Sequence, residues 1–296
     1  MASVQKRKIA DFIIILFMIL VIVVTLYPFL NVTAKSFNDP LDTVKGGIHI
    51  WPRVPTMQNY IGLFARGSNL PVAFRNSVLR TVFGAASGVL CCAMFAFALS
   101  RSDFMFRKLF TVILVITMYA SGGLIPSYLL IRNLGLINSF WVYIIPWLIG
   151  AFNVIVIRSY IDTIPVSLQE SARIDGANDL HIFFKIILPL SKPVLATIAL
   201  FVAVGQWNSW FDTYLYARGT KELSTLQYEL MKVLDSAQAT VGNAQDIYSE
   251  GLRKSRQSPE AIKMAITVIA TVPILVIYPF LQKYFVSGIT LGAVKE

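Results

Sequence analysis

Apolar runs long enough to cross a membrane alternate with polar segments along most of this chain. Six runs approach the length of about 20 residues that a helix needs to span the hydrocarbon of a bilayer. They lie at 12–34, 76–100, 108–131, 139–158, 194–216 and 262–285. The pattern predicts an all-α membrane protein with six transmembrane helices, and an even number of crossings places both termini on one side.

Proline interrupts several of these runs, at Pro28, Pro126, Pro146, Pro273 and Pro279. Such residues are tolerated in membrane helices where neighbouring helices or water satisfy the freed carbonyl groups. We expect kinks near Pro126 and Pro273.

The runs divide the chain into an N-terminal arm, a first helix, a connecting loop, a core and a tail. These are 1–11, 12–34, 35–75, 76–285 and 286–296, and the core includes two long loops at 159–193 and 217–261. Basic residues before the first run raise the alternative of a cleaved signal peptide. Because the run is longer than the usual signal core of about 7 to 15 residues, an uncut helix is expected.

Basic residues near the spans set the predicted orientation, because Lys and Arg concentrate in short cytoplasmic loops. The N-terminal arm has three and the 101–108 connection has three, whereas the opposite connection at 132–138 has one. Both termini and the 159–193 loop are therefore predicted to be cytoplasmic. The loops at 35–75 and 217–261 are then external.

Composition agrees with a membrane protein. The 296 residues are 56% hydrophobic and 14% charged, with a mean hydropathy of +0.65. The net charge of +10 would suggest a nucleic acid partner in a soluble protein. Here the basic residues flank apolar runs, which indicates topology and attraction to membrane lipid rather than to nucleic acid. The adjacent Cys91 and Cys92 lack metal-ligand and disulfide spacing and are interpreted as helix packing.

The stretch 158–193 departs from the apolar pattern. Its charged residues are Arg158, Asp162, Glu170, Arg173, Asp175, Asp179, Lys185 and Lys192. One charge at a bilayer centre costs about 2.5 to 3.5 kcal/mol. The stretch therefore lies outside the membrane, where a partner can reach it.

Local signals predict a short helix in the first half of this stretch. Ser167 and Glu170 have the spacing of a capping box at a helix start, and Gly176 suits a left-handed turn at its end. The helix is either an amphipathic surface segment with no partner or a docking element, in which the small Ser171 and Ala172 permit close approach.

The second half predicts another helix with an apolar face. Asn178 or Asp179 can cap its start, and Pro189 ends it. Ser191 and Pro193 then open the fifth span.

The motif in this stretch resembles the EAA loop of the permease subunits of ABC importers. Glu170-Ser171-Ala172 is followed by Gly176, after nine more residues by Ile186, and then by Leu188-Pro189. Ser171 stands where the motif has alanine, a small-for-small difference. The segments ESARIDGA and ILPLSKPVLATIALF are similar to the carbohydrate, maltose-permease-like branch. So are SGGLIPSYLLIRNLGLINSFW at 121–141 and VGQWNSWFDTYLY at 204–216.

The resemblance implies a type I ABC importer permease fold, with a cytoplasmic coupling helix between spans four and five that docks in a cleft of an ATPase subunit. The residues it assigns to this contact are Glu170, Ser171, Ala172, Asp175, Gly176, Ala177, Leu188 and Pro189. Glu170 can cap the helix, reach a basic residue of the ATPase, or do both. The implied partners are a second permease subunit, expected to be a different chain, two ATPase subunits and an extracellular or periplasmic solute-binding protein.

Aromatic and polar residues of the fifth span are candidates for a substrate pathway. Trp207, Trp210, Phe211 and Tyr214 share one face of a continuous helix, where they can stack on sugars or form an interfacial aromatic belt. Polar groups within spans usually face a bundle interior or a water-filled cavity. The candidate pathway residues are Asn208, Trp210, Asp212 and Tyr214, with Asn153 in the fourth span, for which a hydrogen bond between helices is the alternative.

Motifs for catalysis are missing from the sequence. It has no Gly-rich phosphate loop ending in Gly-Lys-Ser/Thr and no HExxH, and His49 and His181 are isolated. We expect a non-catalytic subunit without metal or cofactor, with ATP and Mg held by the partner ATPases. An ion-coupled secondary transporter or channel is the alternative, although no internal repeat is evident and a docking motif has no role there. An intramembrane enzyme would need paired catalytic groups, and Asp212 stands alone.

The resemblance also implies the cargo and the location. It indicates an oligosaccharide from a plant or algal polysaccharide, and an acidic oligomer such as one from alginate or pectin is the specific expectation. The chain is expected in the bacterial cytoplasmic (inner) membrane. In the related family, the counterpart of the 217–261 loop faces the binding protein and can reach into its cleft.

Overall fold

The structure is a computed structural model that describes residues 2–64, 68–241 and 259–293. Helices dominate these residues, and no β-strand occurs among them. In chain order the elements are α1 (Ala2–Ser36), α2 (Pro40–Val44), α3 (Gln58–Phe64), α4 (Leu70–Ser100), α5 (Arg107–Tyr119), α6 (Leu124–Asn133), η1 (Phe140–Tyr143), η2 (Ile145–Trp147), α7 (Ala151–Ile161), α8 (Ser167–Ile174), α9 (Asp179–Ile182), the π-helical η3 (Phe183–Ile187), α10 (Leu188–Leu190), α11 (Lys192–Asn208), α12 (Phe211–Tyr216), η4 (Lys221–Leu223), α13 (Leu226–Val241) and α14 (Pro259–Ala293).

Three of the described helices are singly long and apolar enough to cross a membrane, over Asp11–Ser36, Leu70–Ser100 and Glu260–Pro279. They contain or overlap the predicted spans at 12–34, 76–100 and 262–285. Two bent pairs also reach that length. Phe140–Trp147 meets Ala151–Ile161 at 47°, and Asp179–Leu190 meets Lys192–Asn208 at 82°.

The predicted span at 108–131 is not one helix. It divides into α5 and α6 around residues 120–123, where Gly123 has a φ of +87°. A positive φ is readily adopted only by glycine, so Gly123, which directly precedes α6, keeps the two helices from being continuous. Pro126 then lies in the first turn of α6, where proline is tolerated.

The N-terminal arm and the tail are continuous with helices. Residues 2–11 belong to α1, and α14 continues to Ala293. Pro28 lies inside α1, and Pro273 and Pro279 lie inside α14, which remains helical through both.

The chain divides into two compact units, 1–68 with 230–272 and 69–229 with 273–296. In the first unit, most of α1 from residue 11 onward is exposed apolar side chain. The loop that follows is organised by the buried Asn38, whose amide donates to Asp42 and Thr43 and accepts from the Val54 N–H. Lys35 pairs with Glu260 at 3.4 Å.

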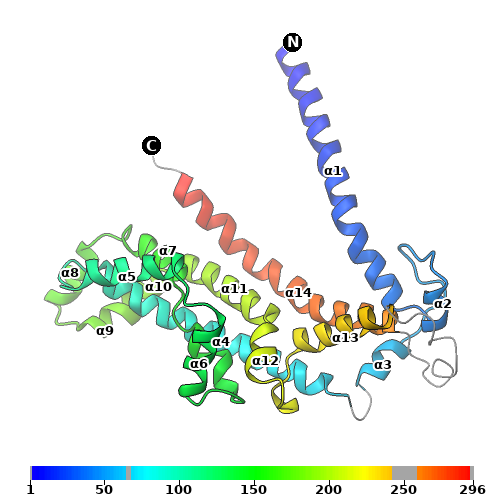
Figure 1. The fold of residues 1–296 in the computed structure, drawn as a ribbon. Coiled ribbons are helices and arrows are strands. Elements are labelled where there is room, and N and C mark those ends of the chain that lie inside the picture. The colour runs from blue at the N-terminus through cyan, green and yellow to red at the C-terminus, as the bar shows by residue number, and fades with distance from the viewer. Residues whose placement is uncertain (1, 65–67, 242–258, 294–296) are drawn as a thin grey trace. The chain divides into compact units, whose positions relative to one another are not determined.

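The second unit is built around α4, α7 and α11. Its apolar core combines Phe97 and Leu99 of α4 with Val154 and Ile157 of α7 and Ile198 of α11. In Figure 1, α8 and α9 lie at one end of this unit, and α6 and α12 lie toward the other. The segment 159–193 is therefore an extension of a packed helical core.

Candidate functional site

The helix expected in the first half of the 158–193 stretch is α8. Its C-terminus is closed by Gly176, which has a φ of +82°. The Ala177 N–H donates to the Ala172 carbonyl at 2.9 Å, and the Gly176 N–H donates to the Arg173 carbonyl at 3.0 Å. This pair of bonds is the Schellman arrangement, so the predicted glycine turn is confirmed.

The predicted capping box is wrong. Val166 already has helical backbone angles, and no side chain caps α8. The Leu168 N–H donates to the Pro165 carbonyl, and the Glu170 N–H donates to the Val166 carbonyl. Because the fixed φ of proline suits a first helical turn, the turn starts ahead of Ser167 and leaves its hydroxyl without a capping role. The Glu170 side chain is exposed, which frees its carboxylate for a partner.

The second half begins with the predicted cap at Asn178, whose side chain accepts from the His181 N–H at 2.8 Å. Ile182, Phe183 and Ile187 are then buried in the core, and the Phe183 ring lies 5.6 Å from that of Phe97. The helical run ends within a residue of Pro189, at Leu190.

At Ser191 the chain turns into α11, as expected, and Pro193 lies in its first turn. The Ser191 side chain does not cap α11. Its hydroxyl is buried and has no hydrogen-bond partner among the described residues.

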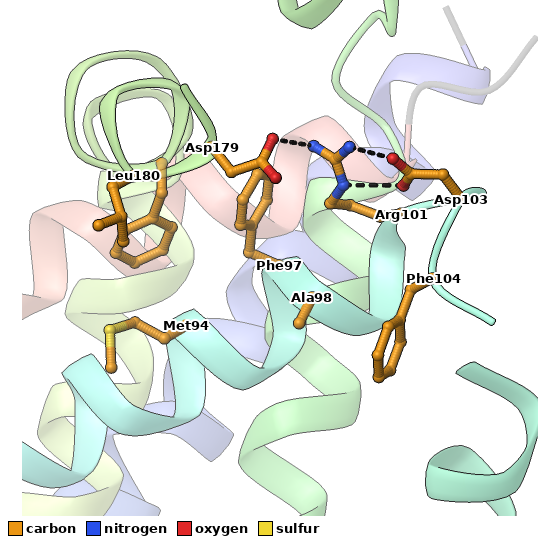
Figure 2. A pocket seen from close by; sticks show the side chains of 9 residues that line it. Met94, Phe97, Ala98, Arg101, Asp103, Phe104, Asp179 and Leu180 are labelled. Atoms are coloured by element: carbon orange, nitrogen blue, oxygen red, sulfur yellow. Dashed lines mark hydrogen bonds and ion pairs between the residues drawn. The ribbon is translucent and has the colours of Figure 1, made fainter. Parts of the chain in front are cut away.

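Four charged residues fasten the α8–α9 turn to the end of α4, and Figure 2 shows three of them, Arg101, Asp103 and Asp179. The Arg101 guanidinium donates to Asp103 at 2.9 Å and to Asp179 at 2.8 Å. Arg173 donates to the same carboxylates at 3.2 and 3.3 Å. Hydrogen bonding from Arg101 holds the pKa of Asp103 below its ordinary value. We refer to Arg101, Asp103, Arg173 and Asp179 as the charge clamp.

A cavity of about 360 Å³ lies beside the charge clamp (Figure 2). Phe97, Phe104 and Leu180 contribute apolar walls, and Arg101 and Asp179 contribute the charged edge. The end of α4 and the 158–193 stretch therefore share one surface.

The predicted coupling residues divide into two groups. Glu170, Ser171, Asp175, Gly176 and Pro189 are exposed. Ala172, Ala177 and Leu188 are partly buried and pack against the core. One group is available to a partner, and the other attaches α8 to the helices beneath it.

Apolar side chains accompany the charged ones on α8. No residue of this helix is buried, and Ile174 is 86% exposed. Val166, just before the helix, is 63% exposed. Large exposed apolar groups rimmed by charge are typical of surfaces that bind another protein.

The predicted aromatic face of the fifth span is wrong, because the helix breaks. α11 ends at Asn208, Ser209 is extended, and α12 begins at Phe211. Trp207 is buried on α11, with its ring 6.1 Å from that of Phe74. Trp210 instead clusters with Phe211 and Tyr214, at ring distances of 5.7 and 6.2 Å.

The sequence predicts that Asp212 lines an open pathway, and this prediction is wrong. Its carboxylate is 4% exposed and accepts two hydrogen bonds from Arg80, at 3.1 and 2.5 Å. Arg80 also donates to Gln206 and to the Ser209 carbonyl, and it lies 4.5 Å from the Tyr143 ring centre. This buried cluster joins α4 to the break between α11 and α12.

The remaining pathway candidates are dispersed. Asn208 is exposed and accepts from Gln227 at 3.2 Å. Tyr214 is 41% exposed and lies beneath the Arg218 guanidinium. Asn153 lines a separate cavity of about 230 Å³ with Gln206 and Ser209.

Sequence reasoning missed Arg80 and Arg101. Arg80 lies within a predicted apolar span, where a charged side chain usually pairs with another charge. The presence of Asp212 in another predicted span was the signal that could have identified this pair. Arg101 carries no local signal for its contact with Asp179. Among the described residues, no group of three or more His, Cys, Asp or Glu is placed to hold a metal ion.

Comparison with known proteins identifies relatives along the whole chain. Residues 4–291 match the family described as binding-protein-dependent transport system inner membrane component. The polygalacturonan/rhamnogalacturonan transport system permease protein YtcP of Bacillus subtilis (strain 168) is 36% identical over 294 residues, which are 98% of this chain and 100% of that protein. The galactooligosaccharides transport system permease protein GanQ of the same organism is 32% identical, over 98% of this chain and 96% of its own.

Solved structures share the fold. A chain in the crystal structure of a bacterial ABC transporter involved in the import of the acidic polysaccharide alginate superimposes with a TM-score of 0.84, at 29% identity. The match covers 95% of this chain and 98% of that one. A chain of the bacterial alginate ABC transporter in complex with alginate pentasaccharide-bound periplasmic protein matches at a TM-score of 0.56 and 18% identity, over 93% of each chain, which shows the fold alone.

Proposed function

Because this chain belongs to the family of binding-protein-dependent transport system inner membrane components, we propose that it is a permease subunit of an ATP-driven importer for an oligosaccharide. A solute-binding protein delivers the cargo, and two cytoplasmic ATPase subunits, which hold ATP and Mg, drive its passage. A second permease subunit, a different chain, completes the pore. The permease relatives and the fold shared with the alginate transporter support this assignment.

One observation supports the coupling mechanism: α8 exposes side chains to a partner and is at the same time firmly attached to the helical core. The exposed groups, Glu170 and Ile174 among them, are available to a cleft on the ATPase. Ala172, Ala177 and the charge clamp hold α8 to the core. Movement of the ATPases on binding ATP would therefore be passed to α4, α7 and α11 and would open the pore to the outside.

This role requires the 158–193 stretch and both termini to be cytoplasmic and the 35–75 and 217–261 loops to be external. The family match favours it over the ion-coupled transporter or channel. The cargo we propose is an oligomer from a plant or algal polysaccharide, including acidic ones such as those from alginate or pectin. Relatives named for polygalacturonan and for galactooligosaccharides support this class.

Ile174→Glu tests the docking of α8. We expect membrane insertion to be unchanged and ATP-driven uptake by the reconstituted transporter to fall at least about tenfold, because a charge replaces an apolar contact at the interface. Thr163→Glu is the matched control, an exposed residue of the same stretch outside α8. Normal uptake by Ile174→Glu, or purification of the intact transporter without an ATPase, would contradict the proposal.

A further inference from the structure

A second cavity lies next to Asn153, among the helices that are predicted to cross the membrane. It has a volume of about 230 Å³ and lies between α4, η2, α7 and α11. The residues that matter to its chemistry are Arg80, Trp147, Asn153, Gly205, Gln206 and Ser209. All of them belong to the same compact unit.

The Asn153 amide has no hydrogen-bond partner among the described residues. It faces the cavity with two donors and an acceptor. An unpaired polar group that faces hydrocarbon costs several kcal/mol. The cavity is therefore better placed on a water-filled path than against lipid.

Trp147 gives the cavity an aromatic wall and is 60% exposed. A sugar ring offers a face of C–H groups, which can pack on an indole, and a rim of hydroxyl groups, which can pair with amides. The combination of one exposed indole with the amide of Asn153 fits both features, whereas the buried Gln206 amide is already bonded to Arg80 and to the Tyr143 carbonyl. The volume lies below the roughly 300–1,000 Å³ of pockets for larger ligands, so it suits one ring.

Arg80 is not available to a negatively charged cargo. A guanidinium has five N–H donors, and Arg80 makes five hydrogen bonds, to Gln206, Ser209 and Asp212. Its charge is compensated by the buried Asp212. The cavity therefore offers no free cation to a carboxylate.

We propose that this cavity is a subsite for a single sugar ring of the passing oligosaccharide, read through its ring face and hydroxyl groups and not through a carboxylate. The inference rests on the proposed function. It keeps Asn153 of the predicted pathway residues, adds Trp147 and Gly205, and leaves out Asn208, Trp210, Asp212 and Tyr214.

Gly205 supplies an independent way to test the subsite. A Cβ at this position would meet nothing within 4 Å, whereas a Cβ at Gly84 would lie 2.9 Å from the Gln206 side chain. Because an added side chain starts in open space at this lining residue, Gly205→Leu is expected to take up cavity volume. Gly205→Ala leaves most of the space and is its control.

The experiment measures uptake and ATP hydrolysis by the complete transporter in proteoliposomes with its loaded binding protein. Its variants are Trp147→Ala, Asn153→Ala and Gly205→Leu. Trp141→Ala is the matched control for Trp147→Ala, because Trp141 is 58% exposed on the neighbouring η1. One neutral and one acidic oligosaccharide of equal length are used, both carried by the unmodified transporter.

We expect Trp147→Ala and Gly205→Leu to lower uptake about tenfold, as loss of a specific pocket contact does, and by the same factor for both substrates. Hydrolysis stimulated by the binding protein should stay within about twofold, and so should uptake by the controls. Unchanged uptake by all three variants, an equal loss in the controls, or a loss confined to the acidic substrate would overturn the subsite. Failure of the unmodified transporter to take up any oligosaccharide would instead refute the proposed function.

Discussion

Arg80 and Asp212 depend on each other because neither charge has access to water. Their side chains are 1% and 4% exposed. Removing one member of a buried pair costs about 3 to 5 kcal/mol, since the other charge is left unpaired. We expect Arg80→Met and Asp212→Leu each to lower the thermal unfolding temperature of the purified subunit in detergent, followed by tryptophan fluorescence.

The double variant separates charge pairing from packing. Arg80→Met with Asp212→Leu leaves no isolated charge, so it should unfold at a higher temperature than either single variant. It should remain below the unmodified protein, because Gln206 and the Ser209 carbonyl lose their donor. A double variant less stable than both single ones would contradict the pairing.

Gly176 is the residue on which the end of α8 depends. Its φ of +82° costs a residue with a side chain about 1 to 2 kcal/mol. Gly176→Ala should therefore loosen α8 and lower uptake severalfold while the subunit still inserts, and Gly176→Asn should be milder because asparagine tolerates this conformation. Gly219→Ala is the control, since Gly219 has ordinary backbone angles and open space. Equal uptake by Gly176→Ala and Gly219→Ala would show that the turn is not needed.

The charge clamp makes the 158–193 stretch and the end of α4 a single mechanical element. The Arg101 side chain is only 10% exposed and bridges two carboxylates. We expect Arg101→Gln to lower the number of sugars imported per ATP hydrolysed, because α8 could then move without α4. Asp162→Asn, which breaks the longer 3.7 Å surface pair with Arg158, is the control and should leave this ratio unchanged.

Two further results decide the role of the charge clamp. Asp179→Asn should act in the same direction as Arg101→Gln and less strongly, because Arg101 retains Asp103. If Arg101→Gln reduces uptake and hydrolysis equally, the clamp contributes to stability alone.

Elements with local signals could be predicted from the sequence, and those set by distant contacts could not. Gly176, Asn178 and Pro193 act within their own turns, so their roles in helix ends were visible. The start of α8 was placed wrongly because Pro165 begins the turn before Ser167. The break at Ser209 and Trp210 was missed because it is braced by Arg80, which lies 132 residues from Asp212.

The same division applies to the candidate site. The motif around Glu170 and Gly176 marks α8, since its residues are close in sequence. Arg101 and Asp179 are 78 residues apart, and only the packed fold brings them together. A charged residue inside a predicted span, such as Asp212, indicates a substrate pathway when its partner is unknown. The partner of Asp212, Arg80, could be identified only from the structure.

At the level of the whole molecule, the coupling mechanism depends on which side of the membrane each loop lies. Within Asp11–Ser36 of α1, an 18-residue window has a mean hydropathy of 3.0 and no buried residue, which suits a helix surrounded by lipid. Basic residues at the arm and at 101–108 favour the cytoplasm for both. The 35–75 and 217–261 loops must then be external if the 158–193 stretch is to meet an ATPase.

Cysteine labelling tests this arrangement in right-side-out membrane vesicles, with Cys91 and Cys92 replaced by alanine. Lys45→Cys and Arg218→Cys, both at exposed positions, should react with a membrane-impermeant maleimide in sealed vesicles. Asp162→Cys, which lies outside α8 and so is not covered by a docked ATPase, should react only after the vesicles are opened. Labelling of Asp162→Cys in sealed vesicles would place the coupling stretch on the outer face, where no ATP-driven partner could reach it, and would refute the coupling mechanism together with the topology.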